Sequence, residues 1–348
     1  MWEERVYRTR RDIAALGASG LGVSDLHNAA IQLIENRVGT DLTCWATIDP
    51  ETLVISTMTG ARVAPDYELW LAESEYSANE PHTFAALARR KQPMARFTDL
   101  PDRDRTRSIR FNEVWRPLGV HQELRVLFLA DGACWGAAGM VRADRDFTDR
   151  ETDFLTAVAP AIASATRLAV RSETRCMVQS RGAAIVVVGA HGELRALTTA
   201  GQEWQERFDQ IAPGRFLVML QVMAIGARGA KSGSFRARLR DSQGQWAVLE
   251  ASSLIGADED QIAVTIEPAS GDQLMSLLLA AYGLTARERE ICREVIEGHS
   301  TSDIAGHLFI STNTVQDHLK SIFAKVGVRS RGELVARLRP GPRVVEQT

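Results

Sequence analysis

A stripe of polar side chains runs along the segment from residue 311 to residue 326. Its members are Asn313, Gln316, Asp317, Lys320 and Ala324, and the apolar positions between them are Val315, Leu319, Ile322, Phe323 and Val326. This spacing predicts an amphipathic helix with one face in a core and the polar face in solvent. Amide, carboxylate and ammonium groups on such a face can hydrogen-bond to base edges in the DNA major groove. Gln316, Asp317 and Lys320 are therefore the predicted base-reading residues.

Both ends of this segment carry groups that suit phosphate oxygens. Short hydroxyl and amide side chains occupy its start, at Ser311, Thr312, Asn313 and Thr314. A helix N-terminus adds free backbone amides and a positive dipole there. Basic side chains occupy or follow the other end, at Lys325, Arg329 and Arg331. We predict that these groups hold the DNA backbone, which positions the protein without reading its sequence.

Asp317 is an acid on a surface that is expected to face an acidic polymer. Two roles are open to it. It can accept a hydrogen bond from the N4 amine of a cytosine, or it can pair with Lys320 three residues later and orient that lysine. The pairing is favoured, because a carboxylate that faces DNA must offset phosphate repulsion.

The helix of 311–326 lies among other predicted helices. Start signals are read at Thr285 with Glu288, at Ser300 with Asp303, at Ser311, and at Ser330 with Glu333. Gly298 can end the first of these helices. A three-residue turn at 309–311 then joins the second helix to the third, which is helix-turn-helix geometry. Periodicity alone leaves a second interpretation open, namely a small helical bundle that serves only as a dimerisation or adaptor module.

Residues 284–338 resemble the C-terminal DNA-binding domain of LuxR-type (GerE-like) regulators. The landmarks are "LTARERE", Gly298, "IA" at 304–305, "STNTV", "HL" at 318–319, "KVGV" and "SRGEL". The resemblance implies a four-helix helix-turn-helix whose third helix reads the major groove and whose fourth helix dimerises. The candidate dimer stripe is Leu334, Val335 and Leu338, although these residues could instead close the domain core. Many family members carry Lys where this chain has Gln316, so the target sequence cannot be copied from relatives.

Two mixed regions precede the helical one. Residues 20–170 show a helix that Ser24 could cap, a strand pair, a connecting segment, the hairpin "ELRVLFLADGACWGAAGMVR" and a long helix from 149 to about 172 that Thr148 and Glu151 open. This order resembles a GAF domain. Residues 176–268 show a hairpin, a short helix at about 200–208 and three further strands, and with "GAAIVVVGAHGELRALTTAGQEW" they resemble a PAS domain. The fold class is α+β, with a GAF-like α/β sandwich at 1–172, a PAS-like sheet domain at 173–272 and an all-α module at 273–348.

Aromatic and imidazole side chains in the first region suggest a site for a small ligand. The candidate pocket residues are Trp45, Trp70, His82, Trp115, His121 and Trp135. Trp45 and Trp135 could equally be sheet core. The histidines and the four cysteines (Cys44, Cys134, Cys176 and Cys292) lack paired ligand spacing, so no metal, haem or other cofactor is expected. Cys44 and Cys134 are read as small buried hydrophobes rather than redox sensors.

Composition and charge favour a regulator over an enzyme. The 348 residues carry a net charge of -3, with +2 on 283–339 and -5 before it, so the basic character sits in the helical module. No catalytic motif is recognised, and neither a signal peptide nor a membrane-spanning apolar run is read. The expectation is a cytoplasmic bacterial transcriptional regulator that binds double-stranded DNA as a homodimer, contacts RNA polymerase and answers a small-molecule effector. The alternative is a ligand-binding sensor that acts through protein contacts, with the helical module as its dimerisation device.

Overall fold

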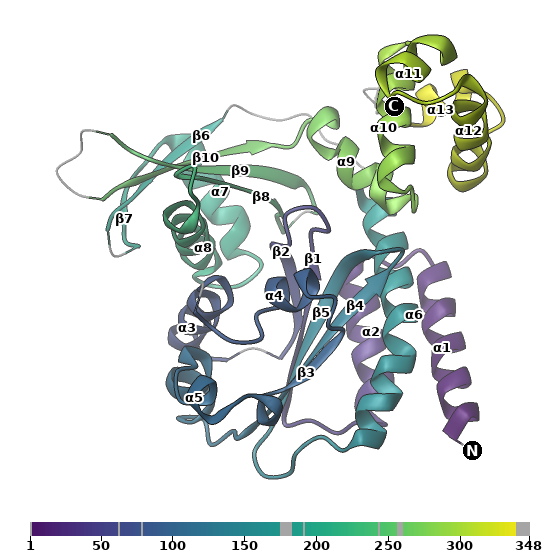
Figure 1. The fold of residues 1–348 in the computed structure, drawn as a ribbon. Coiled ribbons are helices and arrows are strands. Elements are labelled where there is room, and N and C mark those ends of the chain that lie inside the picture. Colours follow the sequence, from purple (N-terminus) through teal and green to yellow (C-terminus); the bar gives the residue numbers. More distant parts are fainter. Residues whose placement is uncertain are drawn as a thin grey trace, which may run out of the picture. The chain divides into compact units, whose positions relative to one another are not determined.

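The computed structural model describes residues 2–61, 63–77, 79–174, 183–190, 192–242, 244–255 and 260–338. The chain forms two compact units, shown by ribbon in Figure 1. Unit 1 comprises residues 1–169 and 178–269, and unit 2 comprises residues 170–177 and 270–348. Unit 1 therefore holds both of the regions that the sequence analysis separates. Cys176 lies outside the described residues.

Unit 1 contains two antiparallel sheets. The first has five strands in the order β2-β1-β5-β4-β3, namely β1 (Leu42–Ile48), β2 (Ile55–Gly60), β3 (Met94–Arg96), β4 (Gln122–Ala130) and β5 (Ala133–Arg142). The predicted strands and hairpin in this region are therefore present. Its interior strands are buried on both faces, since β5 has buried residues at nearly every position. Such continuous burial requires helices over both sides of the sheet.

Helices supply that cover. Figure 1 shows α1 (Trp2–Ala18), α2 (Val23–Glu35) and α6 (Asp149–Thr174) side by side on one face. The other face carries α3 (Pro65–Tyr76), α4 (Phe84–Arg89), η1 (Phe97–Asp99), α5 (Asp102–Arg105) and the π-helix η2 (Arg110–Trp115). The backbone amide of Thr148 donates to Glu151 at 2.8 Å, which confirms the predicted start of α6. Ser24 does not cap α2, because it lies inside the helix and Gly22 occupies the cap position.

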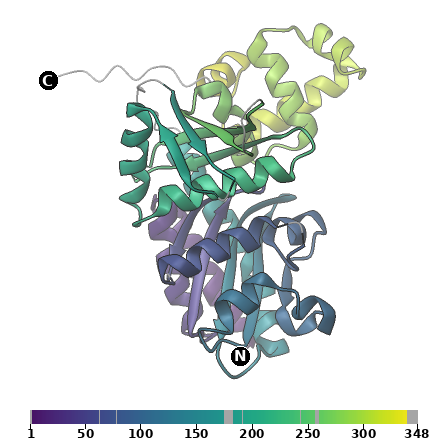
Figure 2. The ribbon, with the colours of Figure 1, turned by 90° about the vertical axis from the view of Figure 1, so that its left-hand side faces the viewer.

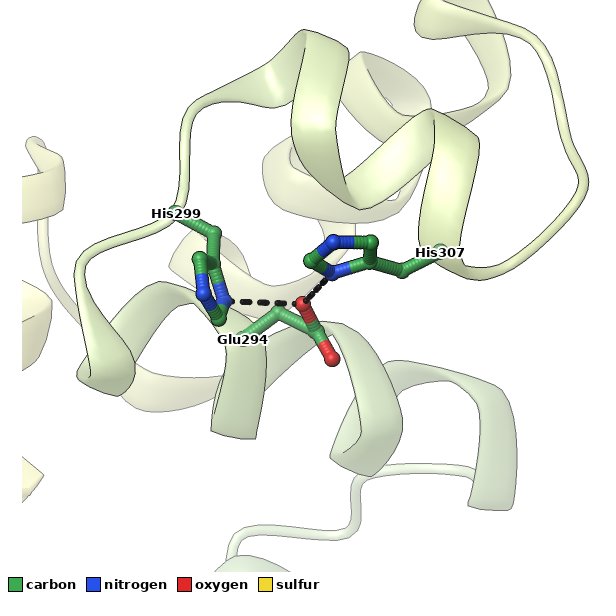
Figure 3. Close-up of side chains that lie close together, drawn as sticks. All are labelled: Glu294, His299 and His307. Carbon is green, nitrogen blue, oxygen red and sulfur yellow. Dashed lines mark hydrogen bonds and ion pairs between the residues drawn. The ribbon is translucent and has the colours of Figure 1, made fainter.

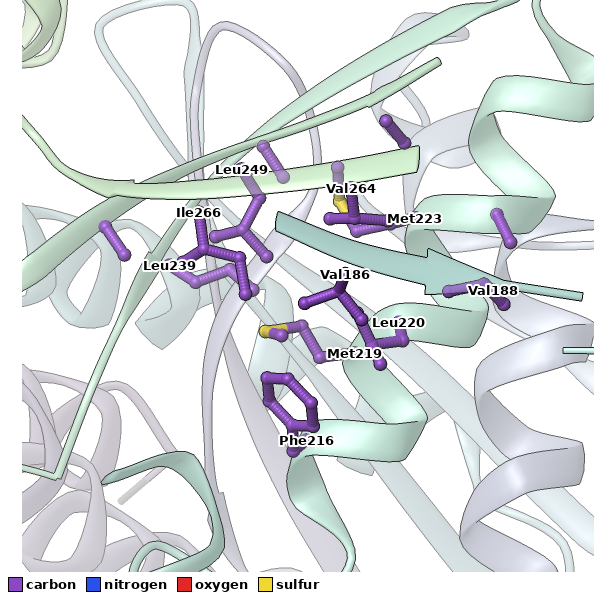
Figure 4. Close-up of a cluster of buried hydrophobic side chains, with 14 of the residues drawn as sticks. Val186, Val188, Phe216, Met219, Leu220, Met223, Leu239, Leu249, Val264 and Ile266 are labelled. Carbon is purple, nitrogen blue, oxygen red and sulfur yellow. The ribbon is translucent and has the colours of Figure 1, made fainter. Parts of the chain in front are cut away.

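The second sheet repeats the strand order of the first, counted from its own first strand. Its order is β7-β6-β10-β9-β8, with β6 (Ala184–Val188), β7 (Leu194–Leu197), β8 (Ser234–Arg240), β9 (Trp246–Ser253) and β10 (Ile262–Pro268). The helices α7 (Thr199–Asp209) and α8 (Arg215–Gly229) accompany it, as Figure 2 shows from a second side. These strands and α7 were expected from the sequence, whereas α8 was not. Figure 4 shows the reason for α8, whose Phe216, Leu220 and Met223 fill the core beneath the sheet.

Within unit 1 the two sheet regions share polar and apolar contacts. Val54 and Tyr76 from the first region pack into the core of the second sheet. Arg238 on β8 donates to Asp49, which follows β1, at 2.6 and 2.9 Å, and Nη2 of Arg238 also lies 2.7 Å from Glu51. The side chain of Asp49 is 0% exposed and that of Arg238 is 7% exposed. A buried ion pair of this kind ties the regions together, since Asp49 without Arg238 would be a buried charge that lacks its ionic partner.

Unit 2 is helical in the part that the structure describes. Its elements are α9 (Gly271–Ala281), α10 (Ala286–Glu297), α11 (Thr301–His307), α12 (Thr312–Val326) and α13 (Arg331–Leu338). Capping boxes open α10 at Thr285 and α11 at Ser300, and Ser311 caps α12. Gly298 ends α10 with a φ of 96°, in the left-handed region that favours glycine. Ser330 accepts from the Glu333 amide at 3.2 Å where α13 begins, so the four helix starts expected from the sequence are confirmed.

Among the described residues, one helix, α6, has a length and an apolar composition that would allow it to cross a membrane. The core helix of a protein that does not cross a membrane can have the same length and composition. In α6, 56% of the apolar 18-residue stretch is buried inside the protein. Ala163 and Ala165 of α6, for example, are almost inaccessible to solvent. Because polar residues interrupt its apolar positions, α6 was not predicted from the sequence to cross a membrane.

Candidate DNA-binding surface and effector cavity

The polar stripe of α12 lies in solvent and its apolar stripe lies in the core of unit 2. Val315, Ile322 and Val326 are buried, and Leu319 and Phe323 pack against them. The exposed positions are Asn313, Gln316, Asp317, Lys320 and Ala324. The amphipathic helix predicted from the sequence is therefore confirmed. Its exposed face presents the amide, acid and amine that could meet base edges.

Asp317 is paired with Lys320 along this face. Nζ of Lys320 lies 3.0 Å from Oδ1 of Asp317, and both side chains are about three-quarters exposed, at 76% and 74%. The pair that the favoured role of Asp317 requires is therefore present, and the role itself, which is to orient the lysine, stays a prediction. An exposed pair of this kind adds little stability. Its effect is to restrict where the ammonium group points.

Two of the predicted phosphate-binding residues make contacts inside unit 2. Lys325 on α12 donates to Oε2 of Glu288 on α10 at 2.6 Å, and Ser321 donates to the other oxygen at 2.6 Å. Burial alone would raise the pKa of Glu288, but the bonds from Lys325, Ser321 and the Thr285 amide outweigh it and lower the pKa to about 2. Arg331 donates to the carbonyl of His299. Both cations thus fix the frame that presents α12, while Arg329 is exposed.

The N-terminal residues of α12 are exposed, as a phosphate contact requires. Ser311, Thr312, Asn313 and Thr314 all reach solvent. The hydroxyl of Ser311 is already used, because it accepts from the Thr314 amide at 3.1 Å as the helix cap. The Thr314 hydroxyl also shares a hydrogen bond with the Ser311 hydroxyl at 2.8 Å, so Thr312 and Asn313 are the side chains at this end that could meet an anion.

The candidate dimer stripe on α13 is mostly interior. Leu334 and Leu338 are fully buried in the core of unit 2, and Val335 is partly buried against that core. Of the three residues, Val335 alone retains exposed surface. The contacts of the two leucines agree with the alternative interpretation, in which these residues complete the core of the helical domain.

Residues 283–338 match the family model of bacterial regulatory proteins, luxR family. The spore germination protein GerE of Bacillus subtilis is 40% identical over 55 residues, which are 16% of this chain and 74% of GerE. The chain belongs to the luxR family of bacterial regulatory proteins. The monoamine regulon transcriptional regulator of Klebsiella aerogenes is 56% identical over 54 residues, or 16% of this chain and 24% of that protein.

Most of this luxR-family chain lies outside these matches. An HTH-type transcriptional regulator of Mycobacterium tuberculosis is 52% identical over 52 residues, which are 15% of this chain and only 6% of that protein. Among solved structures, the VqmA–ligand–DNA complex of Vibrio cholerae matches 45% of this chain and 80% of its own, at 16% identity and a TM-score of 0.23. SdiA of Escherichia coli matches 47% and 84%, at 16% identity and a TM-score of 0.17. Likenesses this weak carry no conclusion.

Unit 1 of the luxR-family chain contains a cavity of about 360 Å³. Its walls come from the first sheet, from α3 and from α8, so both sheet regions contribute. Apolar side chains such as Leu71, Val222 and Met223 supply much of the lining, and Glu75, Arg110, Glu123 and Arg125 bring charge to it. Apolar walls with a few fixed polar groups are typical of sites for small molecules.

The charged residues of this cavity form one buried network. Arg125 donates to Glu75 at 2.5 Å and lies over the ring of Phe84. Arg110 donates to Glu123 at 2.9 Å, and its Nη1 lies 3.2 Å from Glu80. Burial alone would raise the pKa of Glu123, but Arg110 and then Arg125 outweigh it, so its pKa is lowered. These side chains are held rigidly at the wall of the cavity.

Two donors in this network make no hydrogen bond within the described part of the chain. One is Nη1 of Arg110, although it lies 3.2 Å from Glu80 in an ion pair. The other is Nε of Arg125, which is buried and makes no hydrogen bond there. A buried guanidinium N–H that lacks a partner is costly, so a ligand atom that accepts from it would be stabilised. Carbonyl and carboxylate oxygens are acceptors of this kind.

The aromatic residues chosen from the sequence do not gather in this cavity. Trp115 lines it and donates to Glu123 at 3.2 Å. Trp45 and Trp135 are each 1% exposed in the core, as the alternative held, while Trp70 is 40% exposed. His82 is partly buried, with a pKa lowered by that burial, and His121 is exposed. Apart from Trp115, none of the candidate pocket residues lies in the cavity lining.

Cys134 is buried, as predicted, whereas Cys44 is partly buried and lines the cavity. Burial raises the pKa of Cys44 to about 11 and that of Cys134 to about 12, so both thiols are protonated near neutral pH. Protonated thiols react slowly with oxidants.

The charged residues that line the cavity were not predicted from the sequence. Glu123 and Arg125 stand two apart in a strand, and charged residues that alternate in this way are typical of a solvent-exposed face.

Proposed function

We propose that this luxR-family chain is a sequence-specific DNA-binding transcriptional regulator that inserts α12 into the major groove. The observation that carries the proposal is the separation of the helix into a buried apolar stripe and an exposed stripe with Gln316, Asp317 and Lys320. The family match and the net positive charge of residues 283–339 support it. Gln316, Asp317 and Lys320 would read bases, with Ser311, Thr312, Asn313, Thr314, Lys325, Arg329 and Arg331 near the backbone.

The proposed regulator acts as a homodimer on a two-fold related site, since one recognition helix spans few base pairs. Dimerisation would use the surface of α13, where Val335 stays partly exposed. Contact with RNA polymerase and a cytoplasmic location belong to the same proposal. The two sheet regions would be GAF-like and PAS-like sensor domains, which their shared strand order supports.

Lys320→Ala tests the base-reading role of α12. On a duplex selected from a randomised pool by the wild-type protein, the change should weaken binding by roughly 1–3 kcal/mol. On a random-sequence duplex the loss should be smaller, because that complex rests on phosphate contacts. Fluorescence anisotropy at fixed salt measures both affinities, and Lys231→Ala, an exposed lysine in unit 1, is the matched control.

Salt dependence separates this proposal from its alternative. Phosphate contacts release counterions, so the affinity for a random-sequence duplex should fall steeply as salt rises. A sensor whose helical module serves only for dimerisation would show a flat response. A flat salt titration, or equal binding by the wild type and Lys320→Ala on the selected duplex, would reject the proposed role.

We further propose that the cavity of unit 1 binds the effector, a small molecule with an apolar body and an oxygen acceptor for Arg125. Native mass spectrometry of the purified protein should report a retained molecule. Val222→Phe places a ring into the cavity from α8 and should abolish the retained mass without loss of helical content. Ile185→Phe, at a half-exposed position on β6 outside the lining, should leave the retained mass in place. Retention in Val222→Phe would exclude this cavity.

A further inference from the structure

Two histidines and a glutamate meet at the surface of unit 2, as Figure 3 shows. Glu294 lies on α10, His299 lies in the loop after it, and His307 is the last residue of α11. Nδ1 of His307 lies 2.7 Å from Oε2 of Glu294, and Nδ1 of His299 lies 2.9 Å from the same oxygen. One carboxylate oxygen therefore faces two imidazole nitrogens from different elements.

The backbone around these residues is fixed by independent bonds. The amide of His299 donates to the carbonyl of Glu294 at 3.1 Å, next to the left-handed Gly298. Ser300 then opens α11 through its capping box, and Arg331 of α13 donates to the carbonyl of His299. The loop that carries His299 is thus held from three sides. The convergence of the side chains does not depend on a free loop conformation.

The donor set suits a borderline divalent cation. Imidazole nitrogen and carboxylate oxygen bind zinc at about 2.0–2.2 Å, so donor atoms around a tetrahedral ion lie roughly 3.3 Å apart. The three donor atoms here lie within 4.8 Å of one another, so small rotations of the exposed side chains suffice to reach that geometry. The side chains of His299 and His307 are 37% and 51% exposed, which leaves open positions for water.

The hydrogen bonding also leaves room for an ion. Nδ1 of His299 is close to Glu294 but has no hydrogen bond of acceptable geometry among the described residues. The two rings stand edge to face with centroids 4.9 Å apart. Glu297 lies 3.6 Å from Nδ1 of His299 and adds a further carboxylate nearby. A divalent ion would replace the shared proton contacts with direct bonds and offset this negative charge.

We propose that Glu294, His299 and His307 form a binding site for a divalent transition-metal ion of the zinc class. Water completes the coordination, as in other sites with three protein ligands. The ion joins the end of α10 to the end of α11. His307 is separated from the 309–311 turn by Leu308 alone, so the ion braces the segment that leads into α12.

The test uses the untagged full chain after treatment with a chelator. Calorimetric titration with zinc chloride should show one equivalent bound to the wild type. His299→Gln and His307→Gln should each weaken that binding about tenfold or more, because each removes a ligand. Cobalt(II) offers a second readout, since its visible bands report nitrogen and oxygen coordination directly. The matched control is His318→Gln, a histidine of α12 outside the cluster.

The melting temperature with and without zinc tests whether an ion at this site stabilises unit 2. Zinc should raise the melting temperature of the wild type and of His318→Gln but not that of His307→Gln, because an ion that binds only the folded state stabilises it. Glu294→Gln keeps the size of the side chain, so it covers the case in which a histidine variant fails to fold. No stoichiometric binding to the wild type, or wild-type zinc affinity in His307→Gln, would overturn the proposal.

Discussion

His27 is a basic residue placed where a charge would be costly. It is 0% exposed on α2, its Nε2 lies 2.9 Å from the hydroxyl of Thr166, and the ring of Trp45 meets it edge to face. Burial lowers its pKa from 6.5 to about 4. The imidazole is therefore neutral in the folded protein at neutral pH. Sequence pattern gives no hint of this, because a lone histidine on a helix has no characteristic spacing.

The protonation of His27 should make unit 1 acid-sensitive. The unfolded chain binds a proton near pH 6.5 and the folded chain only near pH 4, so stability is complete above pH 6.5 and falls as the pH drops toward 4. The loss from this residue should reach roughly 3 kcal/mol. Urea unfolding across this pH range measures it.

His27→Leu should flatten that pH dependence, and His121→Leu, which changes an exposed histidine, should not. His82, whose pKa is also lowered by burial, should leave a smaller residual slope in the His27 variant. An unchanged slope in His27→Leu would contradict the assignment.

Local chemical signals account for which residues of the candidate site could be anticipated. Gln316, Asp317 and Lys320 were selected because they alternate with apolar positions at helical spacing, and the structure leaves all three exposed. Glu123 and Arg125 were overlooked, because their charges are neutralised by Arg110 and Glu75, which are far from them in sequence. A charge that is buried by distant partners looks like a surface charge when only its neighbours are read.

The helices of unit 2 could be located from the sequence because their boundaries are marked by residues that lie close together in the chain. Each capping box joins residues three apart, so Thr285 and Ser300 announce α10 and α11 without tertiary information. The helix α8 was missed for the opposite reason. Its sequence RFLVMLQVMAIGARG is apolar on most sides, and a helix without a polar face shows no amphipathic period.

Glu288 connects α10 to α12 and should control the stability of unit 2. Glu288→Gln removes the charge that receives Lys325 and Ser321, so we expect a loss of about 1–3 kcal/mol in unfolding free energy. The wild-type contribution should be complete above pH 4.5 and should disappear as the pH falls toward about 2, because the folded pKa is lowered. Thermal unfolding followed by helical circular dichroism measures both effects.

Glu290→Gln is the control for this change. Glu290 lies on the same helix, but its partner Arg287 is a surface residue three positions away, and its own side chain is 46% exposed. Its loss should cost well under 1 kcal/mol. Equal destabilisation by the two variants would show that the link between α10 and α12 does not depend on Glu288.

At the scale of the whole molecule, the order and the long-range pairing of the strands could not be predicted from local sequence patterns. The strands of both sheets except β3 were anticipated from alternating and continuous apolar runs. That both sheets would share one order depends on which strands pair, and pairing joins segments such as β1 and β5 that are far apart in sequence. The common core around Val54 and Tyr76 likewise had no local signal.

The buried contact between Asp49 and Arg238 joins positions that are 189 residues apart. Breaking such a pair by losing one partner costs about 3–5 kcal/mol, because the other charge stays desolvated. Exchange of either sheet region with that of another regulator would therefore carry this cost unless the matching residue came along. The two regions should be inherited together as one cassette during the recombination of regulators, and a truncation between them should yield two poorly folded halves.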